Sequence, residues 1–507
     1  MDQSDVLIVG AGPTGLVLAL WLTKMGVRVR IIDRTAAPGT TSRALAVQAR
    51  TLELYRQLDL TQAVLERGHS VPGINLWVRG ERATRVPFAT IAEGLTPYGP
   101  FIFPQDEHER LLIERLAALG VTVERSTELI GFTANAAAVS ATLRGPDGEP
   151  RFCEVAYLAG CDGARSAVRE GMAAAFPGGT YEQLFYVADV DAAGPSLDGE
   201  LHIDLEEADF LAVFPLRGTG RARLVGTVRD ERAAHPDTLR FEDVSARAIG
   251  NLKVEVRTVH WFSTYKVHHR VTNRFRHGRV FLLGDAAHIH SPAGGQGMNT
   301  GIGDAINLAW KLRAVLSGCA PDRLLDSYET ERRAFARRLV ATTDRGFTLA
   351  TAEGRTADFI RTRIVPVVVP ALFRLDVARE YLFSAVSQIV IAYRDSPLSA
   401  GKAGAVHGGD RVPWAKGAAR DNFDALTTTG WQLHVYGALR PELAAWCASR
   451  VEAHAFDWEP VHETAGLCRN GMYLIRPDAY VAFAATEQDP ALLERYLSGH
   501  GLRLGAS

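Results

Sequence analysis

A glycine-rich turn near the start of the chain constrains the fold more than any other feature. The turn, residues 10–15, has the spacing Gly-x-Gly-x-x-Gly. Residues 5–9 before it, apolar from Val6 on, predict a buried strand, and residues 16–25 after it predict a helix. A second strand is predicted at residues 27–32. Such a strand-helix-strand unit is typical of a parallel sheet with a right-handed crossover, so we expect a doubly wound α/β fold.

Each glycine of the turn has a physical role when a dinucleotide binds. Gly10 allows the tight turn, Gly12 lets a pyrophosphate approach the backbone at the helix N-terminus, and Gly15 lets helix and strand pack closely. Asp33 ends the second strand, where its carboxylate can accept a hydrogen bond from a ribose hydroxyl. A tight turn without a ligand is the alternative. The strand, helix and acid together favour dinucleotide binding.

The buried-strand pattern returns late in the chain and makes the first domain discontinuous. Residues 280–284 predict a strand, Asp285 follows it, and the glycine-rich residues 294–303 open a helix predicted at residues 304–316. A carboxylate at the end of a strand, followed by glycines that open a helix, suits a second contact with the same cofactor. Since glycine is unfavourable unless the backbone approaches a ligand or takes a positive φ, this density argues against a merely flexible loop.

Two regions have a different texture. Residues 180–265 alternate in a way that predicts a mostly antiparallel sheet inserted between the two nucleotide-binding parts, and a glycine-rich boundary precedes a further small α/β unit. The predicted segments are residues 1–178 as the first part of the nucleotide-binding domain, 179–270 with parts of 73–103 as the substrate-binding sheet domain, 271–398 as the second nucleotide-binding part with long helices, and 399–507 as the terminal domain.

Composition and charge exclude several kinds of partner. With 56 basic and 58 acidic residues the formal net charge is −2, so no global field attracts nucleic acid. Five cysteines without a CxxC pair do not make a disulfide framework, and we expect a cytoplasmic protein. The apolar run 364–373 has about half of the ~20 residues of a membrane span, so none is predicted. The histidines His268, His269, His288 and His290 lack metal-ligand spacing, so no metal is predicted.

Three segments taken in order resemble the class A flavoprotein monooxygenases, the flavin-dependent aromatic hydroxylases. They are the turn Gly10-x-Gly12-x-x-Gly15, the segment Cys161-Asp162-Gly163-Ala-Arg-Ser166-x-Val168-Arg169, and Gly284-Asp285-Ala-Ala-His288-x-His290-x-Pro292 with Gly295-Gln-Gly297-Met-Asn299. The tail is similar to the thioredoxin-like domain of the phenol and polyketide hydroxylase branches, but without a CxxC we expect no thiol redox role. The resemblance implies a discontinuous Rossmann-like FAD-binding domain, an inserted antiparallel-sheet substrate domain and a small thioredoxin-like C-terminal domain.

The resemblance also implies which residues contact the cofactor. The first turn and Asp33 would hold the ADP half of FAD, Asp285 would reach its ribityl or pyrophosphate region, and backbone amides near Gly297 would face the isoalloxazine. Arg43, Pro292, Gly295 and Gly297 would position the flavin, and no catalytic side chain is assigned. The full predicted set is Gly10, Gly12, Pro13, Thr14, Gly15, Asp33, Arg34, Arg43, Gln105, Leu129, Asp162, Asp285, Pro292, Gly295, Gly297, Met298 and Asn299.

Some of these residues have structural alternatives. For Arg43 the alternative is a surface charge, and for Gln105 it is a helix cap. Around Asp162, either Ser166 and Arg169 bind an anionic phosphate, or Asp162 caps a helix beside a structural ion pair. Both interpretations stay open at this point.

The implied reaction is reduction of FAD by NADPH or NADH, capture of O2 as a flavin C4a-hydroperoxide, and hydroxylation of a phenolic or polyketide-type aromatic substrate. Oxygen transfer needs a dry pocket, and apolar strands of the inserted sheet suit one wall of it. Ordinary sheet core is the alternative for each aromatic residue there. The predicted substrate contacts are Phe214, Pro215, Trp261, Pro292, Ala293 and Gly294.

Other functions remain open from the sequence. Within the same fold, the alternatives are epoxidation and Baeyer–Villiger insertion, because the pocket and not the motifs decides among them. From another class, the alternative is a flavin-containing binding protein that sequesters an aromatic ligand. The terminal domain either forms a homodimer interface or covers the core.

Overall fold

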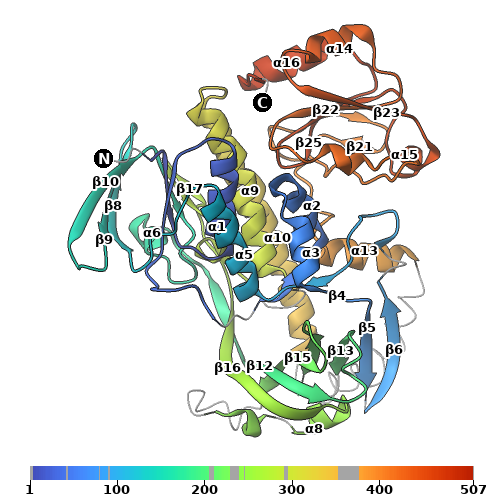
Figure 1. Ribbon diagram of the computed structural model, residues 1–507. Coiled ribbons are helices and arrows are strands. Elements are labelled where there is room, and N and C mark those ends of the chain that lie inside the picture. Colours follow the sequence, from blue (N-terminus) through green and yellow to red (C-terminus); the bar gives the residue numbers. More distant parts are fainter. Residues whose placement is uncertain are drawn as a thin grey trace.

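A five-stranded sheet forms the centre of the nucleotide-binding part (Figure 1). The computed structural model describes residues 4–40, 44–78, 80–88, 92–204, 210–228, 239–244, 246–290, 295–351 and 376–505. The sheet's strands, in spatial order, are β17 (Arg276–His277), β18 (Val280–Leu282), β11 (Tyr157–Gly160), β1 (Val6–Val9) and β2 (Val29–Ile32). All neighbouring strands of this sheet pair in parallel except β17 and β18, which pair antiparallel. The sheet combines strands from residues 6–32, 157–160 and 276–282, which are far apart in the sequence. The predicted discontinuous α/β fold is confirmed.

Helices cover this sheet because their buried faces are apolar. In α1 (Pro13–Lys24), eight consecutive residues from Gly15 to Leu22 are buried, and it packs against α5 (Gln105–Ala118) and α9 (Gly297–Leu316). The remaining helices of this part are α2 (Ala49–Tyr55), α3 (Thr61–Arg67), α6 (Ala167–Gly171), α10 (Asp326–Thr351) and α13 (Asp376–Val386). Two small sheets complete it, one of β10 (Pro150–Val155), β9 (Val139–Arg144) and β8 (Glu128–Ala134), the other of β3 (Ala46–Val47), β7 (Phe101–Ile102) and β4 (His69–Ser70).

The inserted sheet has eight strands and lies below these helices in Figure 1, with α8 (Ala246–Asn251) beneath it. Its strands, in spatial order, are β19 (His288–Ile289), β16 (Glu255–Val271), β12 (Gly178–Ala193), β15 (Arg221–Val228), β14 (Leu211–Pro215), β13 (Leu201–Asp204), β5 (Gly73–Val78) and β6 (Glu81–Pro87). One face packs on Val244, Ala248 and Leu252 in and around α8. The short strand β19 joins the sheet to the loop that follows Asp285.

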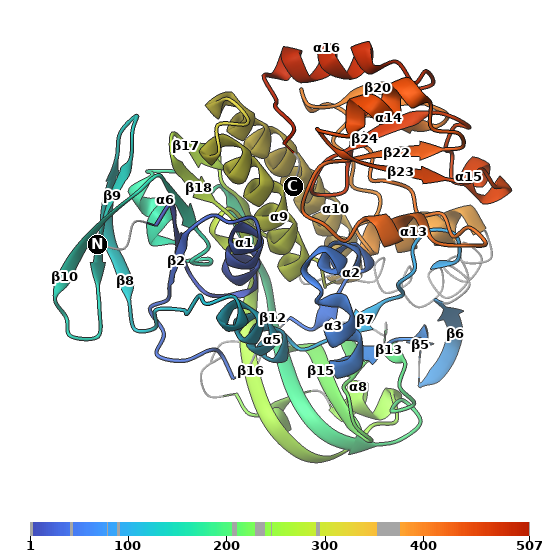
Figure 2. The same ribbon diagram turned by 45° about the horizontal axis from the view of Figure 1, so that its top comes forward.

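The C-terminal unit, residues 400–505, is a six-stranded mixed sheet with helices (Figure 2). Its strands, in spatial order, are β21 (Val406–His407), β20 (Ala400–Ala403), β25 (Val481–Ala485), β24 (Met472–Ile475), β22 (Gln432–Tyr436) and β23 (Glu452–Phe456), and its helices are α14 (Pro441–Cys447), α15 (Pro460–Thr464) and α16 (Pro490–His500). Among the described residues no helix combines the length and the apolar character needed to cross a membrane.

Buried charges join the C-terminal unit to the long helices. Glu331 of α10 accepts hydrogen bonds from Arg476 at 2.7 and 2.9 Å and from Lys311 of α9 at 2.8 Å, and Arg476 also donates to Asp478 at 2.9 Å. Burial opposes ionisation of Glu331, but Arg476 and Lys311 outweigh it and hold the pKa of that carboxyl well below its usual range. Burial lowers the pKa of Lys311 to about 8, against the opposing effect of Glu331. The C-terminal unit is thus attached through buried charged side chains, which are stable in the interior only while they stay paired.

We expect Glu331→Ala to lower the free energy of unfolding by about 3–5 kcal/mol, because it leaves Arg476 and Lys311 buried without their common carboxylate. Urea denaturation followed by circular dichroism measures the change. Asp147→Asn is the control, since Asp147 pairs with Arg151 at the exposed surface, where solvent screens the pair and its loss should change stability little. Equal losses in the two variants would contradict a structural role for the buried network.

Candidate functional site

The glycine-rich turn places three glycines in three different environments. A Cβ on Gly10, whose φ is 103°, would lie 2.3 Å from the Cys161 carbonyl oxygen, and one on Gly15 would lie 2.0 Å from the Gly10 carbonyl oxygen. The chain itself therefore requires both. A Cβ on Gly12 would meet no described atom within 4 Å. Gly12 is the N-cap of α1. The open space beside it therefore lies at the helix N-terminus, where unpaired N–H groups and the positive end of the helix dipole favour an anion.

Asp33 lies beside this turn, as the motif requires. Its Oδ2 accepts a hydrogen bond from the Ala11 N–H at 2.7 Å, and its Oδ1 accepts one from the Thr35 N–H at 2.8 Å. Arg125 Nη1 is 3.8 Å from Asp33, and Arg125 Nη2 is buried with no hydrogen-bond partner among the described residues. An unpaired guanidinium N–H beside the expected ribose site suits a polar ligand.

Arg125 was not predicted from the sequence. Glu124 bridges to Ile32 in parallel, which brings Arg125 to the same edge of the sheet as Asp33. The signal was the short apolar-alternating run after α5, whose carboxyl end reaches this edge in a doubly wound fold.

The other predicted contacts on this side are spread out. Gln105 is the first residue of α5, whose N-cap is Pro104, and its amide donates to Glu109 at 2.7 Å. Burial, with a smaller contribution from Asp33, raises the pKa of Glu109. Arg34 is exposed, Leu129 is buried in β8, and Pro13 is the first residue of α1.

Asp285 follows β18, at the carboxyl ends of the central strands. Its side chain is solvent-exposed, yet enough protein surrounds it that burial raises the pKa of its carboxyl above the usual value. Asp162 ends the neighbouring strand, and burial raises its pKa too. Its Oδ1 is buried and has no hydrogen-bond partner in the described part of the chain.

The contacts around Asp162 favour the structural alternative for its two neighbours. Ser166 caps α6, its hydroxyl accepting from the Arg169 N–H at 2.9 Å. The Arg169 guanidinium donates to the carbonyls of Ala286 at 3.0 Å and Ala164 at 2.8 Å. Arg169 therefore ties the two loops together through backbone groups. Of the three residues, Asp162 is the one left with an unpaired oxygen.

Thr14 explains part of the second glycine cluster. A Cβ on Gly284 would lie 2.7 Å from Thr14 Oγ1, and one on Gly301 would lie 2.2 Å from it. The Thr14 side chain is thus wedged between the loop after β18 and the first turns of α9. These glycines serve close packing of the protein around the first turn.

The start of α9, residues 295–300, is held by the side chain of Asn299. Its Oδ1 accepts from the Gln48 N–H at 2.9 Å and Thr51 Oγ1 at 2.8 Å, and its Nδ2 donates to the carbonyls of Ala46 at 2.9 Å and Gly295 at 3.0 Å. The side chain is fully used by the protein. We call residues 295–300 the α9 entry.

Two more of the predicted residues lie in this entry. Gly297 is the first residue of α9, and Met298 is partly buried against the core. Arg43, Pro292, Ala293 and Gly294 lie outside the described residues.

Asp304 is a buried residue that the sequence analysis missed. It accepts hydrogen bonds from the Gly284 N–H at 3.0 Å, from His288 Nε2 at 2.6 Å and from Arg332 Nε at 2.6 Å. Burial opposes its ionisation, but Arg332 and His288 hold the pKa of Asp304 below its usual value. The loop that carries Asp285 is thereby fixed to α9 and α10. Among the described residues no cluster of three His, Cys, Asp or Glu could hold a metal ion.

The register of the inserted sheet decides which predicted substrate residues lie together. Phe214 pairs with Arg223, Arg223 with Asp189, and Asp189 with Trp261. Directly paired residues point to one face, so Phe214 and Trp261 share a face with a charged pair between them. Pro215 alternates to the other face, where Ala222 and the α8 core lie.

The face with Phe214 is turned toward the α9 entry. Phe214 packs against a cluster of Leu45 and Leu216 that also contacts Ala46, and a Cβ on Gly295 would lie 2.7 Å from the Ala46 Cβ. Arg223 donates to both oxygens of Asp189, at 2.6 and 2.8 Å, and lies 5.7 Å from the Trp261 ring centroid. This face of the sheet therefore carries aromatic side chains, and the charges of Arg223 and Asp189 between them neutralise each other.

Comparison with known proteins gives one family and a consistent set of relatives. Residues 3–343 match the model of the FAD binding domain family. The 6-methylpretetramide 4-monooxygenase of Streptomyces rimosus is 36% identical over 95% of this chain and 90% of its own length. The 12-dehydrotetracycline 5-monooxygenase/anhydrotetracycline 6-monooxygenase of Streptomyces rimosus subsp. rimosus is 33% identical over 96% of both chains.

Solved structures agree. The OxyS anhydrotetracycline hydroxylase from Streptomyces rimosus has a TM-score of 0.78 at 30% identity, covering 99% of this chain and 100% of that one. Aklavinone-11 hydroxylase, solved in a ternary complex with FAD and aklavinone, has a TM-score of 0.77 at 27% identity over 99% and 100%.

Gly12 and Gly15 variants should separate ligand binding from folding. We expect Gly12→Ala to change the stability of the FAD-free protein by less than about 0.5 kcal/mol, because its Cβ meets no described atom. The same Cβ fills the space where a diphosphate would sit, so the dissociation constant for FAD should rise about tenfold or more, about 1.4 kcal/mol.

Gly15→Ala is the matched control. Its Cβ would clash with the Gly10 carbonyl, so it should destabilise the FAD-free protein by about 1–3 kcal/mol. Thermal unfolding and FAD fluorescence titration measure both quantities. Unchanged FAD affinity in Gly12→Ala would remove this turn from the cofactor site.

His108 makes stability depend on pH. It is a fully buried residue of α5, its Nε2 lies 2.8 Å from Tyr55 Oη, and burial lowers the pKa of His108 from 6.5 to about 3. Below 6.5 the unfolded chain binds a proton that the folded protein takes up only near 3. The stabilisation is therefore complete above 6.5 and is lost, at about 1.4 kcal/mol per pH unit, as the pH falls.

The unfolding free energy of the wild type should fall as the pH is lowered from about 6 to about 4. We expect His108→Gln to reduce that fall by about 1.4 kcal/mol per pH unit. Urea unfolding across this range measures it, with the exposed His277→Gln as control. A wild-type slope in His108→Gln would show that His108 does not stay neutral.

Proposed function

This chain belongs to the FAD binding domain family of flavin-dependent monooxygenases, and we propose that it hydroxylates a polycyclic aromatic polyketide. The observation that carries the proposal is the face of the inserted sheet between Phe214 and Trp261, which is aromatic and turned toward the α9 entry. Relatives named as monooxygenases match nearly the whole chain, so the enzyme interpretation is confirmed over that of a binding protein. Their named substrates are tetracyclic, which supports a substrate of that class here.

FAD is the cofactor of the family, and the residues present fit it. The open space at Gly12 would take its diphosphate at the N-terminus of α1, and Asp33 would accept from a ribose hydroxyl. Arg125, beside Asp33, and Asp162, beside Gly10, each offer a buried atom without a hydrogen-bond partner in the described part of the chain. When bound, FAD supplies the exchange of electrons with the nicotinamide cofactor and with O2.

The protein's own contribution is position and exclusion of water. The α9 entry would direct backbone N–H groups and the positive end of a long helix at the flavin, which favours negative charge there. Phe214 and Trp261 would cover the flat face of the substrate. The Asp189 carboxylate, fixed by Arg223, is suited to accept a hydrogen bond from a substrate hydroxyl.

We propose NADPH as the electron donor, with NADH as the alternative. We also propose that the protein works in the cytoplasm. All five cysteines lie in the described part of the chain and are unpaired, which supports a reducing compartment. The buried charges that attach the C-terminal unit support its role in covering the core.

The test is oxygenation of anhydrotetracycline by the FAD-loaded protein with NADPH in air. We expect the compound to accelerate NADPH consumption and to yield a product one oxygen atom heavier, identified by mass spectrometry. The position of the oxygen, read by NMR, separates hydroxylation from epoxidation and Baeyer–Villiger insertion.

Trp261→Ala should raise KM for the aromatic compound more than it lowers kcat, because it removes binding surface. FAD that NADPH and NADH both fail to reduce, with every polycyclic phenol tried, would contradict the proposed function.

A further inference from the structure

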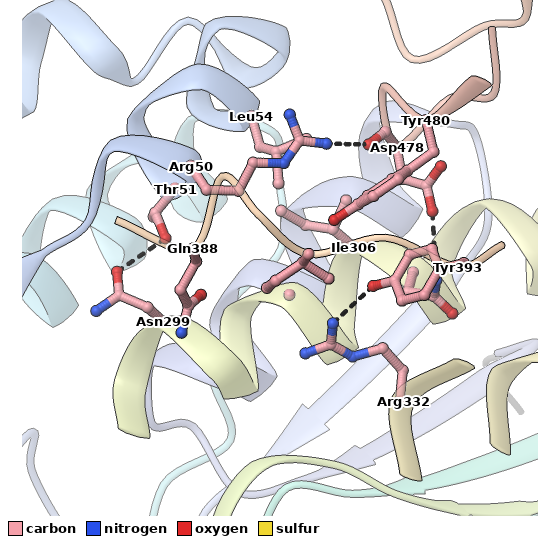
Figure 3. A pocket seen from close by; sticks show the side chains of 13 residues that line it. Arg50, Thr51, Leu54, Asn299, Ile306, Arg332, Gln388, Tyr393, Asp478 and Tyr480 are labelled. Atoms are coloured by element: carbon pink, nitrogen blue, oxygen red, sulfur yellow. Dashed lines mark hydrogen bonds between the residues drawn. The ribbon is translucent and has the colours of Figure 1, made fainter. Parts of the chain in front are cut away.

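A short linker between α13 and the C-terminal unit contacts the α9 entry. The linker is residues 386–393, and it lies beside the first turns of both α9 and α2. Figure 3 shows Gln388 next to Thr51 and Asn299 at the edge of a small cavity, with Tyr393 opposite. The linker thus reaches the two elements that the cofactor motifs bring together.

Gln388 makes the central contact. Its Nε2 donates to Gln296 Oε1 at 2.6 Å and to Thr300 Oγ1 at 3.1 Å, and Gln296 Nε2 donates in return to the Val386 carbonyl at 2.7 Å. Gln388 and Gln296 are each 4% exposed. Two buried amides, one bonded to the other and the second bonded to the linker backbone, leave little freedom to either segment, since buried polar groups cannot exchange such bonds for water.

The backbone of Gln388 is unusual in a way that points to a requirement. Its φ is 60°, in the left-handed region that side chains other than glycine, asparagine and aspartate rarely adopt. Such a conformation persists only when surrounding contacts over-determine it. Here it turns the amide onto the first turn of α9.

Three more hydrogen bonds extend the attachment. Arg332 donates to Tyr393 Oη at 2.7 Å and to the Thr300 carbonyl at 2.9 Å, and the Arg50 N–H donates to the Ser387 carbonyl at 3.1 Å. The linker therefore holds the α9 entry through Gln296 and Thr300, and holds α2 through Arg50.

The cavity at this junction is about 20 Å³, which is room for about one water molecule and excludes an aromatic substrate. The junction is a packed contact between elements. Displacing the linker must move the α9 entry, because close-packed interiors transmit shifts.

We propose that the linker sets the position of the flavin-facing α9 entry, and that Gln388 is a positioning residue for FAD. The linker would then act on the cofactor site through the α9 entry. This inference rests on the proposed contact between the α9 entry and the isoalloxazine.

The test compares Gln388→Gly with wild type. Glycine removes the amide and accepts a φ of 60° without strain, so the backbone path stays favourable. Titration of the FAD-free protein with FAD should show a dissociation constant raised about 5- to 150-fold, the usual range for coupling between sites. Amide hydrogen exchange should accelerate in residues 296–303 and stay unchanged in α1.

Arg394→Gln is the matched control, since the exposed Arg394 pairs with Asp410 just beyond the linker. It should match wild type in both measurements. An FAD dissociation constant within about twofold of wild type in Gln388→Gly would overturn the proposal. Exchange that accelerates equally in α1 and α9 would also overturn it, since the linker would then only stabilise the fold. Wild-type protein that binds no FAD would instead refute the proposed function.

Discussion

A buried carboxylate, Asp304, holds together the elements on which the site depends. An ionised carboxylate stays in a protein interior only when partners surround it. Here Gly284 and His288 come from the loop after β18, and Arg332 comes from α10. Losing any one of them would leave a buried charge poorly paired. The loop that carries Asp285 and the helix that carries the α9 entry are therefore kept in one relative position.

Steric fit completes what the charges begin. Thr14, from the first turn, fills the space between Gly284 and Gly301, so the first and second glycine clusters pack against each other. Gly10 and Gly15 are required by the same close packing, whereas Gly12 alone of the three leaves space open. The glycines thus divide into those that build the cleft and one that leaves room in it for a ligand.

The C-terminal unit is joined to this frame by polar contacts. Buried ion pairs such as Glu331 with Arg476 add little net stability compared with an apolar interface, but they are directional. Apolar contacts such as that of Trp310 with Trp431 also join the unit to α9, and the hydrogen bonds of Glu331 with Lys311 and Arg476 add direction to them. The bond from Arg332 to Tyr393 continues the same frame from Asp304 into the linker.

The sequence by itself determined the first strand-helix-strand unit and the discontinuous α/β fold, and it predicted the roles of Gly10, Gly12, Gly15 and Asp33, because turn geometry and apolar periodicity are local properties. The family resemblance supplied the cofactor and the class of reaction. Only the tertiary structure decided that Phe214 and Trp261 share a face and Pro215 does not, since strand register is set by pairing between distant segments. Arg125, Asp304 and Gln388 were missed for the same reason. Their partners lie far along the chain, and a hydrogen bond such as that from Gln48 to Asn299, 251 positions apart, leaves no pattern in the sequence around either residue.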